Sequence, residues 1–201
     1  MIQVMGLWNK LFGKKQTPKP KKSPYLPEIE DPLDIAFAKR FTAQGGFFLY
    51  NDTSDQVLKN FKEILKENKW EQSETISLNQ KLAQRFNVDC VDQSTGKLGH
   101  FKAILIQCEF LISNTGKILL SNNQINHFKI KALPKTIIVS AHIRQITRDV
   151  SQGMTKLKNK YSDTIPTNIT TLNIKREDAN HKKNQTQQTS SKNIYLLLED
   201  Y

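Results

Sequence analysis

The chain has 201 residues, of which 37% are hydrophobic, and this is enough for one ordinary hydrophobic core. Its longest apolar runs are far shorter than the roughly 20 residues that cross a bilayer, so the sequence predicts no transmembrane helix. The opening stretch MIQVMGLWNKLFGKK lacks the long apolar run and cleavage site of a secretory signal, so we expect a cytoplasmic protein.

The formal net charge of +11 is unevenly distributed along the chain. Residues 1–22 contain six lysines and no acidic residue, which leaves +5 for the rest of the chain. A nucleic-acid-binding domain usually gathers Lys, Arg and aromatic residues on one folded surface. The mildly basic body therefore argues against a nucleic acid as the partner.

The first segment, residues 1–12, has apolar residues at helical spacing, namely Val4, Leu7, Trp8, Leu11 and Phe12. The stretch KKQTPKPKKSPYLP at 14–27 combines lysines with prolines and predicts an extended or disordered linker. Two interpretations remain open. Residues 1–22 could make a peripheral contact with an anionic membrane surface, or the apolar face could pack on the domain or on a protein partner. We expect a tail over 1–27 and a folded domain over 28–201.

The folded part begins with a helix over 35–43, which Gly45 and Gly46 end, and a short strand over 47–50. Capping residues at 51–54 precede an amphipathic helix that we expect to end near residue 67, and a further helix is predicted over 78–86.

Strands are predicted over 101–107, 110–113, 117–121, 136–140 and 194–198, and a helix over 142–158. A polar insertion lies around 175–192. This order of elements predicts an α/β fold with helices on both sides of a mostly parallel central sheet. The stretch LISNTGKILL predicts a hairpin.

Few residues suggest chemistry directly. Cys90 and Cys108 lack the spacing of a metal site and are predicted to be buried thiols, and Trp70 is predicted to be a packing residue. The four histidines form no metal-binding or hydrolase motif, and no nucleotide-binding glycine motif occurs. The sequence therefore predicts no metal site and leaves catalytic residues and cofactors unknown.

Four stretches, in a consistent order, resemble the LUD domain family, the group of lactate-utilisation protein C. AFAKRFTAQGGFFLYN at 36–51 is similar to its opening helix, Gly-Gly stop and first strand. CEFLISNTGKILL at 108–120 is similar to its central hairpin, which commonly contains Ala-Glu-Thr-Gly-Thr. LPKTIIVSAHIRQITRDVSQGM at 133–154 and NIYLLLED at 193–200 resemble the next strand and helix and the closing strand.

The resemblance implies a Rossmann-like αβα sandwich of the NagB/RpiA/CoA-transferase-like type. It also implies a part in the oxidation of L-lactate to pyruvate together with an iron–sulfur partner. The hairpin corner Asn114-Thr115-Gly116 followed by Lys117 then becomes a candidate pocket for a small-molecule, CoA-type or phosphate-type ligand. The alternative is that this corner is only a turn.

A second family pattern, Gly-Pro-Ser-x-Thr-x-Asp-Ile-Glu, matches SDTIPTNIT at 162–170 and adds Asn168 and Thr170 to the candidate pocket. Asn114, Asn168 and Thr170 stand where the family commonly has acids, and an amide cannot replace a carboxylate as general base. Catalysis is therefore expected to be lost or altered. Two functions remain open: a divergent accessory component of lactate oxidation, or a catalytically silent adaptor that its basic tail tethers to a membrane or an acidic partner.

Overall fold

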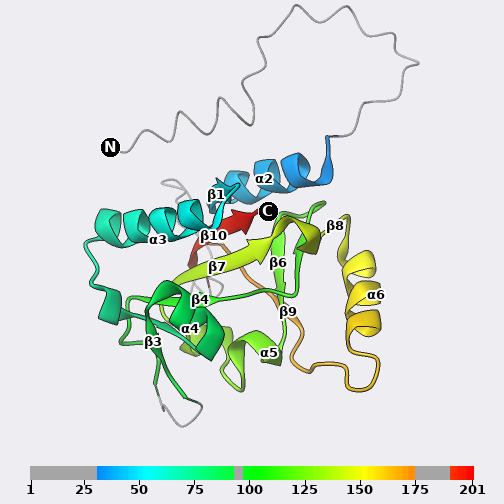
Figure 1. Ribbon diagram of the computed structural model, residues 1–201. Coiled ribbons are helices and arrows are strands. Elements are labelled where there is room, and N and C mark those ends of the chain that lie inside the picture. The colour runs from blue at the N-terminus through cyan, green and yellow to red at the C-terminus, as the bar shows by residue number, and fades with distance from the viewer. Residues whose placement is uncertain (1–30, 93–96, 175–190) are drawn as a thin grey trace, which may run out of the picture.

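The computed structural model describes residues 31–92, 97–174 and 191–201 (Figure 1). The predicted amphipathic segment, the linker and most of the polar insertion lie outside these residues. Lys192, at the end of the predicted insertion, is described and is only 5% exposed.

The central sheet contains six strands in the order β1-β10-β7-β4-β2-β3, and every pair in it is parallel. Its strands are β1 (Phe47–Asn51), β2 (Thr75–Ser77), β3 (Asp89–Cys90), β4 (Ala103–Ile106), β7 (Thr136–His142) and β10 (Asn193–Glu199). The central strands β4, β7 and β10 are almost entirely buried, as expected for parallel strands covered on both faces. The predicted parallel sheet is confirmed.

Two helices, α3 (Ser54–Asn68) and α4 (Gln80–Phe86), cover one face of this sheet (Figure 1). The Thr53 side chain accepts a hydrogen bond from the N–H of Gln56 and so caps α3, and Asn79 caps α4 by accepting from Leu82. Both predicted helices are confirmed.

A second sheet covers part of the other face, and the sequence did not predict it. Its strands follow the order β8 (Ile146–Thr147), β5 (Phe110–Ile112), β6 (Lys117–Leu120) and β9 (Thr170–Thr171). β5 and β6 form the predicted antiparallel hairpin, while β8 runs parallel to β5. A helix, α6 (Val150–Lys160), packs on the outer side of this sheet (Figure 1).

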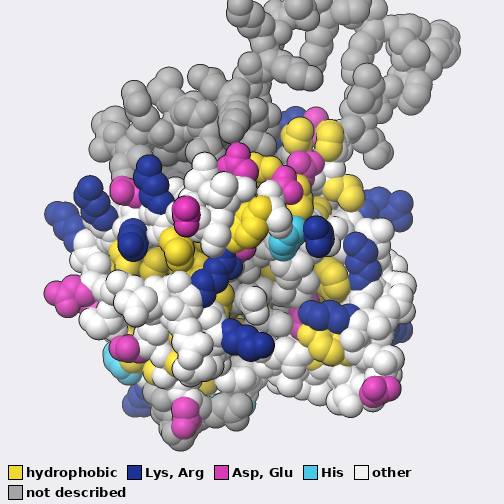
Figure 2. Space-filling model, viewed as in Figure 1, with side chains coloured by type: hydrophobic (Ala, Val, Ile, Leu, Met, Phe, Trp, Pro, Cys, Tyr) yellow, Lys and Arg dark blue, Asp and Glu magenta, His cyan; other side chains and the backbone are white. Residues whose placement is uncertain are grey.

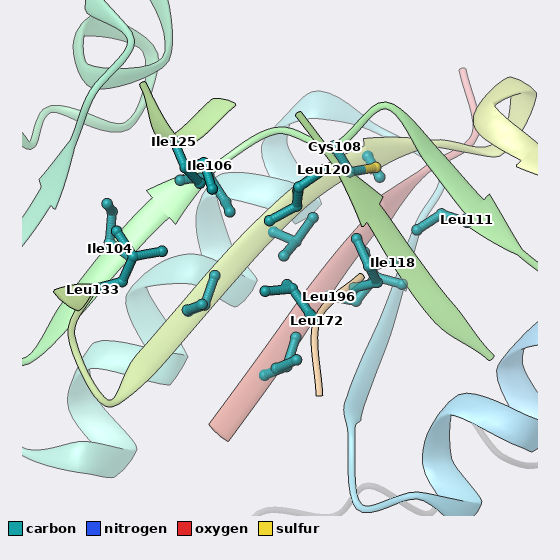
Figure 3. Close-up of a cluster of buried hydrophobic side chains, with 14 of the residues drawn as sticks. Ile104, Ile106, Cys108, Leu111, Ile118, Leu120, Ile125, Leu133, Leu172 and Leu196 are labelled. Atoms are coloured by element: carbon teal, nitrogen blue, oxygen red, sulfur yellow. The ribbon is translucent and has the colours of Figure 1, made fainter. Parts of the chain in front are cut away.

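The largest core cluster fills the space between the two sheets. Figure 3 shows Ile104 and Ile106 of the central sheet on one side of it and Ile118 and Leu120 of β6 on the other. The helices α2 (Leu33–Ala43) and α5 (Asn122–Ile125) close this layer. Three short 3-10 turns complete the described elements, at Gln72–Glu74, Ile130–Ala132 and Ile143–Gln145.

Two predictions were wrong. The helix expected over 142–158 begins only at Val150, because Ile146 and Thr147 pair with β5 and the Asp149 side chain caps the helix start. Cys90 is exposed because it lies in the short edge strand β3, whereas Cys108 is buried as expected. Trp70 packs against the core, as predicted. Within the described residues, no helix is long and apolar enough to cross a membrane.

The surface charges are mixed on the face drawn in Figure 2. Lys and Arg side chains are spread over that face among Asp and Glu side chains, rather than gathered in one stripe. Hydrophobic side chains reach the surface there in small groups.

Candidate functional site

The hairpin corner at 113–116 offers no free backbone N–H group to a ligand. Its four N–H groups all donate to backbone carbonyls, those of Thr147, Arg148 and Ile112. An anion that bound to backbone amides here would have to displace hydrogen bonds of 2.8 to 3.3 Å that the fold already makes. Any ligand at this corner therefore depends on side chains.

The corner is also packed tightly against α2. Gly116 has a φ of +65°, and a Cβ atom at this position would lie 2.6 Å from the backbone nitrogen of Phe41. The Gln44 side chain donates to the carbonyl of Thr115 at 2.6 Å, and Arg40 donates to the carbonyl of Ser113 at 3.1 Å. These contacts give the corner a structural role in joining the hairpin to α2.

The side chains of the corner differ in their surroundings. Asn114 is exposed, and Lys117 is half-buried at the start of β6. The Thr115 hydroxyl is buried and, within the described residues, has no hydrogen-bond partner. Among the described side chains of the corner, it is the buried polar atom that still lacks a hydrogen-bond partner.

Asn168 and Thr170 lie elsewhere. Thr170 pairs with Leu120 at the far end of β6 from Lys117, about 10 Å along the strand. Asn168 is exposed and has a φ of 53°, a conformation that asparagine tolerates. The structure therefore brings residues 114–117 together but places Asn168 and Thr170 at the opposite end of β6.

A different location gathers polar side chains, namely the edge where the parallel strands end. Open α/β sheets bind their ligands outside the carboxyl ends of the strands. Here Asn51, Ser77, His142 and Glu199 are the last residues of β1, β2, β7 and β10. Asn51 and His142 are the register partners of Glu199 on its two sides.

Glu199 is the charged centre of this edge. It is 7% exposed, and Arg85 of α4 contacts both of its carboxylate oxygens at 2.9 and 3.1 Å. The hydroxyls of Ser140 and Tyr201 donate to it at 2.6 and 2.7 Å. Burial alone would raise the pKa of Glu199, but Arg85 and the two hydroxyls outweigh it and hold this pKa below its usual value. The carboxylate is ionised and fully engaged, so it makes a poor general base.

His142 is held in one tautomer beside Glu199. Its Nδ1 accepts the backbone N–H of Arg144 at 3.1 Å, so Nδ1 carries no proton. Its Nε2 lies 2.9 Å from the carbonyl oxygen of Tyr201 and must be the donor in that contact. Neither ring nitrogen is left free in this arrangement.

A second carboxylate, Glu109, is completely buried just before β5, close to the end of α6. Lys160 of α6 contacts it at 2.9 Å, Ser121 donates to it at 2.7 Å, and the Gln124 amide donates at 2.9 Å. Tyr161 is 3.3 Å from both carboxylate oxygens. These donors overcome desolvation and lower the pKa of Glu109. Glu109 thus ties the hairpin strands to α6.

A small cleft opens at the carboxyl ends of β2 and β4, and one residue of its wall, Gln124, donates a hydrogen bond to Glu109. Its volume is about 10 Å³, at the lower limit for one water molecule. Four carboxamides contribute to its wall, together with Ser77, Leu78 and the end of β4; they are Asn79, Gln107, Asn123 and Gln124. The cleft is therefore lined by polar groups that carry no charge. Among the described residues, no group of three or more His, Cys, Asp or Glu could hold a metal ion.

The predicted site residues and this cleft do not overlap. The local sequence pattern did not indicate a role for Glu109 or Glu199, because Glu109 is a single acid just before an apolar strand and Glu199 is the last residue of another. The polar residues of the cleft wall could have been found from their position, because Ser77, Asn79 and Gln107 lie at or just after the ends of parallel strands. The sequence alone did not predict the strand at 75–77, so this position was not visible in it.

The molecule is thus an α/β protein with an open, parallel sheet, and polar side chains gather at the carboxyl edge of that sheet. The sequence model of the LUD domain matches residues 36–198. The chain therefore belongs to the LUD domain family, and the fold agrees with the NagB/RpiA/CoA-transferase-like superfamily.

A solved structure supports the fold. The chain is similar to a DUF162 family protein from Deinococcus radiodurans, with a TM-score of 0.59 and 14% sequence identity. The match covers 84% of this chain and 96% of that one. At this identity the likeness concerns the fold alone. No curated protein matches the chain.

Proposed function

We propose that the chain is an accessory LUD-domain component of L-lactate oxidation to pyruvate, which binds a small polar ligand in the carboxyl-edge cleft without acting as its acid–base catalyst. The observation that carries this proposal is the LUD domain match over most of the chain, because that family is associated with lactate utilisation. The iron–sulfur partner expected from the family resemblance is part of the proposal.

The geometry favours an accessory role over a catalytic one. Both buried carboxylates, Glu109 and Glu199, are ion-paired, and their pKa values are lowered. A general base needs a pKa near the working pH and a free lone pair. Neither carboxylate meets these conditions, whereas the side-chain amides that line the cleft can hold a ligand in place.

Growth on L-lactate tests the proposal. Cells that lack the chain should grow normally on a sugar but poorly on L-lactate, and the full chain should restore growth. A double variant of the cleft, Q107A/N123A, should restore less growth than a variant of the hairpin corner, N114A/T115A. Normal growth on L-lactate without the chain would contradict the proposed pathway. Rescue by the cleft variant alone would instead support a ligand at Asn114 and Thr115.

A further inference from the structure

We infer that the cleft at the ends of β2 and β4 binds a carboxylate group, and that the side-chain NH₂ groups of Asn79 and Gln124 are its donors. This inference rests on the proposed function in one respect, since it takes the cleft as the ligand site. The wall of the cleft and the hydrogen bonds behind it supply the argument.

The orientation of the Gln124 amide is fixed by two neighbours. Its oxygen accepts the backbone N–H of Ser121 at 2.8 Å, and its nitrogen donates to the Glu109 carboxylate at 2.9 Å. A backbone N–H can only donate and an ionised carboxylate can only accept, so the reversed orientation of this amide would lose both bonds. One N–H of Gln124 remains for the cleft.

Asn79 is fixed in the same sense. As the cap of α4, its side-chain oxygen accepts the N–H of Leu82 at 3.0 Å. That bond leaves the NH₂ group as the only free end of the amide, and no described residue accepts a hydrogen bond from it. Asn79 itself is exposed, so a ligand can reach it.

The Ser77 hydroxyl, which also lines the cleft, already has hydrogen-bond partners. The Ser77 hydroxyl donates to the carbonyl of Leu105 at 2.8 Å and accepts the N–H of Asn79 at 3.2 Å. Among the side chains of the wall with a fixed orientation, the free groups are therefore donors, whereas Gln107 and Asn123 each have a donor and an acceptor end. A ligand with acceptor atoms can thus bind to all four carboxamides, and this favours an acceptor as the ligand. Lys160 balances the nearby charge of Glu109, so that carboxylate repels an anion only weakly.

The size of the cleft suits one oxygen of a carboxylate. A volume of about 10 Å³ holds a single water, and a carboxylate oxygen can take the place of that water while the rest of the molecule stays outside. A hydrogen bond to a charged acceptor is roughly twice as strong as one to a neutral acceptor. The cleft should therefore prefer a carboxylate to the neutral amide of the same shape.

Acetate and acetamide test this preference, since the two probes have nearly the same size. The full chain, labelled with ¹⁵N, is titrated with each at constant ionic strength while the side-chain NH₂ signals of Asn79 and Gln124 are followed. We expect saturable shifts with acetate and about tenfold weaker binding of acetamide. Equal affinity for the two probes would overturn the carboxylate inference but leave a ligand-binding cleft in place.

Two matched variants locate the binding. Asn79→Ser keeps an oxygen that caps Leu82 but removes the NH₂ donor, so the melting temperature should stay the same while acetate binding weakens about tenfold. Asn114→Ser makes the same replacement at the exposed hairpin corner and should bind acetate like the unmodified chain. Loss of binding in Asn114→Ser alone, or no shift with either probe, would refute the inference. The growth test on L-lactate decides the proposed function separately.

Discussion

Replacing Gly116 by alanine should destabilise the protein strongly, because two independent penalties meet at this residue. Its φ of +65° lies in the left-handed region, which costs a residue with a Cβ about 1–2 kcal/mol. The new Cβ would also lie 2.6 Å from the nitrogen of Phe41 and 2.7 Å from the carbonyl carbon of Arg40. Backbone atoms of a packed helix cannot move aside as the end of a side chain can, so overpacking adds about 1–3 kcal/mol.

Alanine also restricts the unfolded chain, which offsets about 0.4–1 kcal/mol of this loss. The net destabilisation should be about 3 kcal/mol, equivalent to a fall in melting temperature of about 6–12 °C for a chain of this length. Urea unfolding followed by circular dichroism measures it. Gly99→Ala is the matched control, because a Cβ there meets nothing within 4 Å. A Gly116→Ala protein within about 0.5 kcal/mol of the original would refute the view that the corner is a tight structural joint.

Three further predictions concern the buried carboxylate, a tyrosine and the tail. Lys160→Met should lower the free energy of unfolding, measured with urea, by about 1–2 kcal/mol, because it leaves the Glu109 carboxylate without its counter-ion. Lys158→Met, at an exposed position on the same helix, should lower it by less than about 0.5 kcal/mol. Equal effects of the two variants would show that the ion pair contributes nothing to stability. The hydrogen bond from Tyr50 to Asp200 raises the pKa of that phenol to about 12, so the folded state holds its proton more tightly than the unfolded state. The resulting stabilisation of the folded state is present below the ordinary phenol pKa and is lost as the pH rises toward 12. The absorbance titration curves of the unmodified chain and of Tyr50→Phe should differ by one phenol that titrates near 12. Identical curves would contradict the assignment. If residues 1–22 contact an anionic membrane, the full chain should float with anionic liposomes and a chain lacking these residues should not; flotation of neither form, or of both, would rule out the tail as the membrane contact.

The elements that sequence could predict are those whose signal is local. The helix α3 has apolar residues at regular helical spacing and a capping threonine, and β7 contains the apolar run IIV, so both were predicted close to their observed bounds. The two-residue strands β3, β8 and β9 contain too few residues for any periodicity, and they exist only because longer strands pair with them. The helix α6 was predicted too long for the same reason, since the pairing of β8 with β5 is not visible in the sequence around 142–149.

The turn of the hairpin corner was visible in the sequence, whereas its contacts with α2 were not. The turn at Gly116 was predictable from the sequence, because a turn between two apolar strands needs a residue that accepts a positive φ. The sequence also determined the α/β class, through the alternation of helical and strand patterns. It could not determine that Gln44 and Phe41 press against that turn, since these residues lie about 70 positions earlier in the chain.

The places where polar side chains meet depend on how the sheets and helices pack together. Glu199 with Arg85, and Glu109 with Lys160, join residues 114 and 51 positions apart, and such pairs form only when the sheets are assembled. The carboxamides of the cleft likewise come from three separate segments of the chain. Local patterns fix which residues form helices and strands because the backbone periods are short-range. The partners of a buried charge are fixed by packing, because desolvation makes an unpaired charge costly wherever the fold places it.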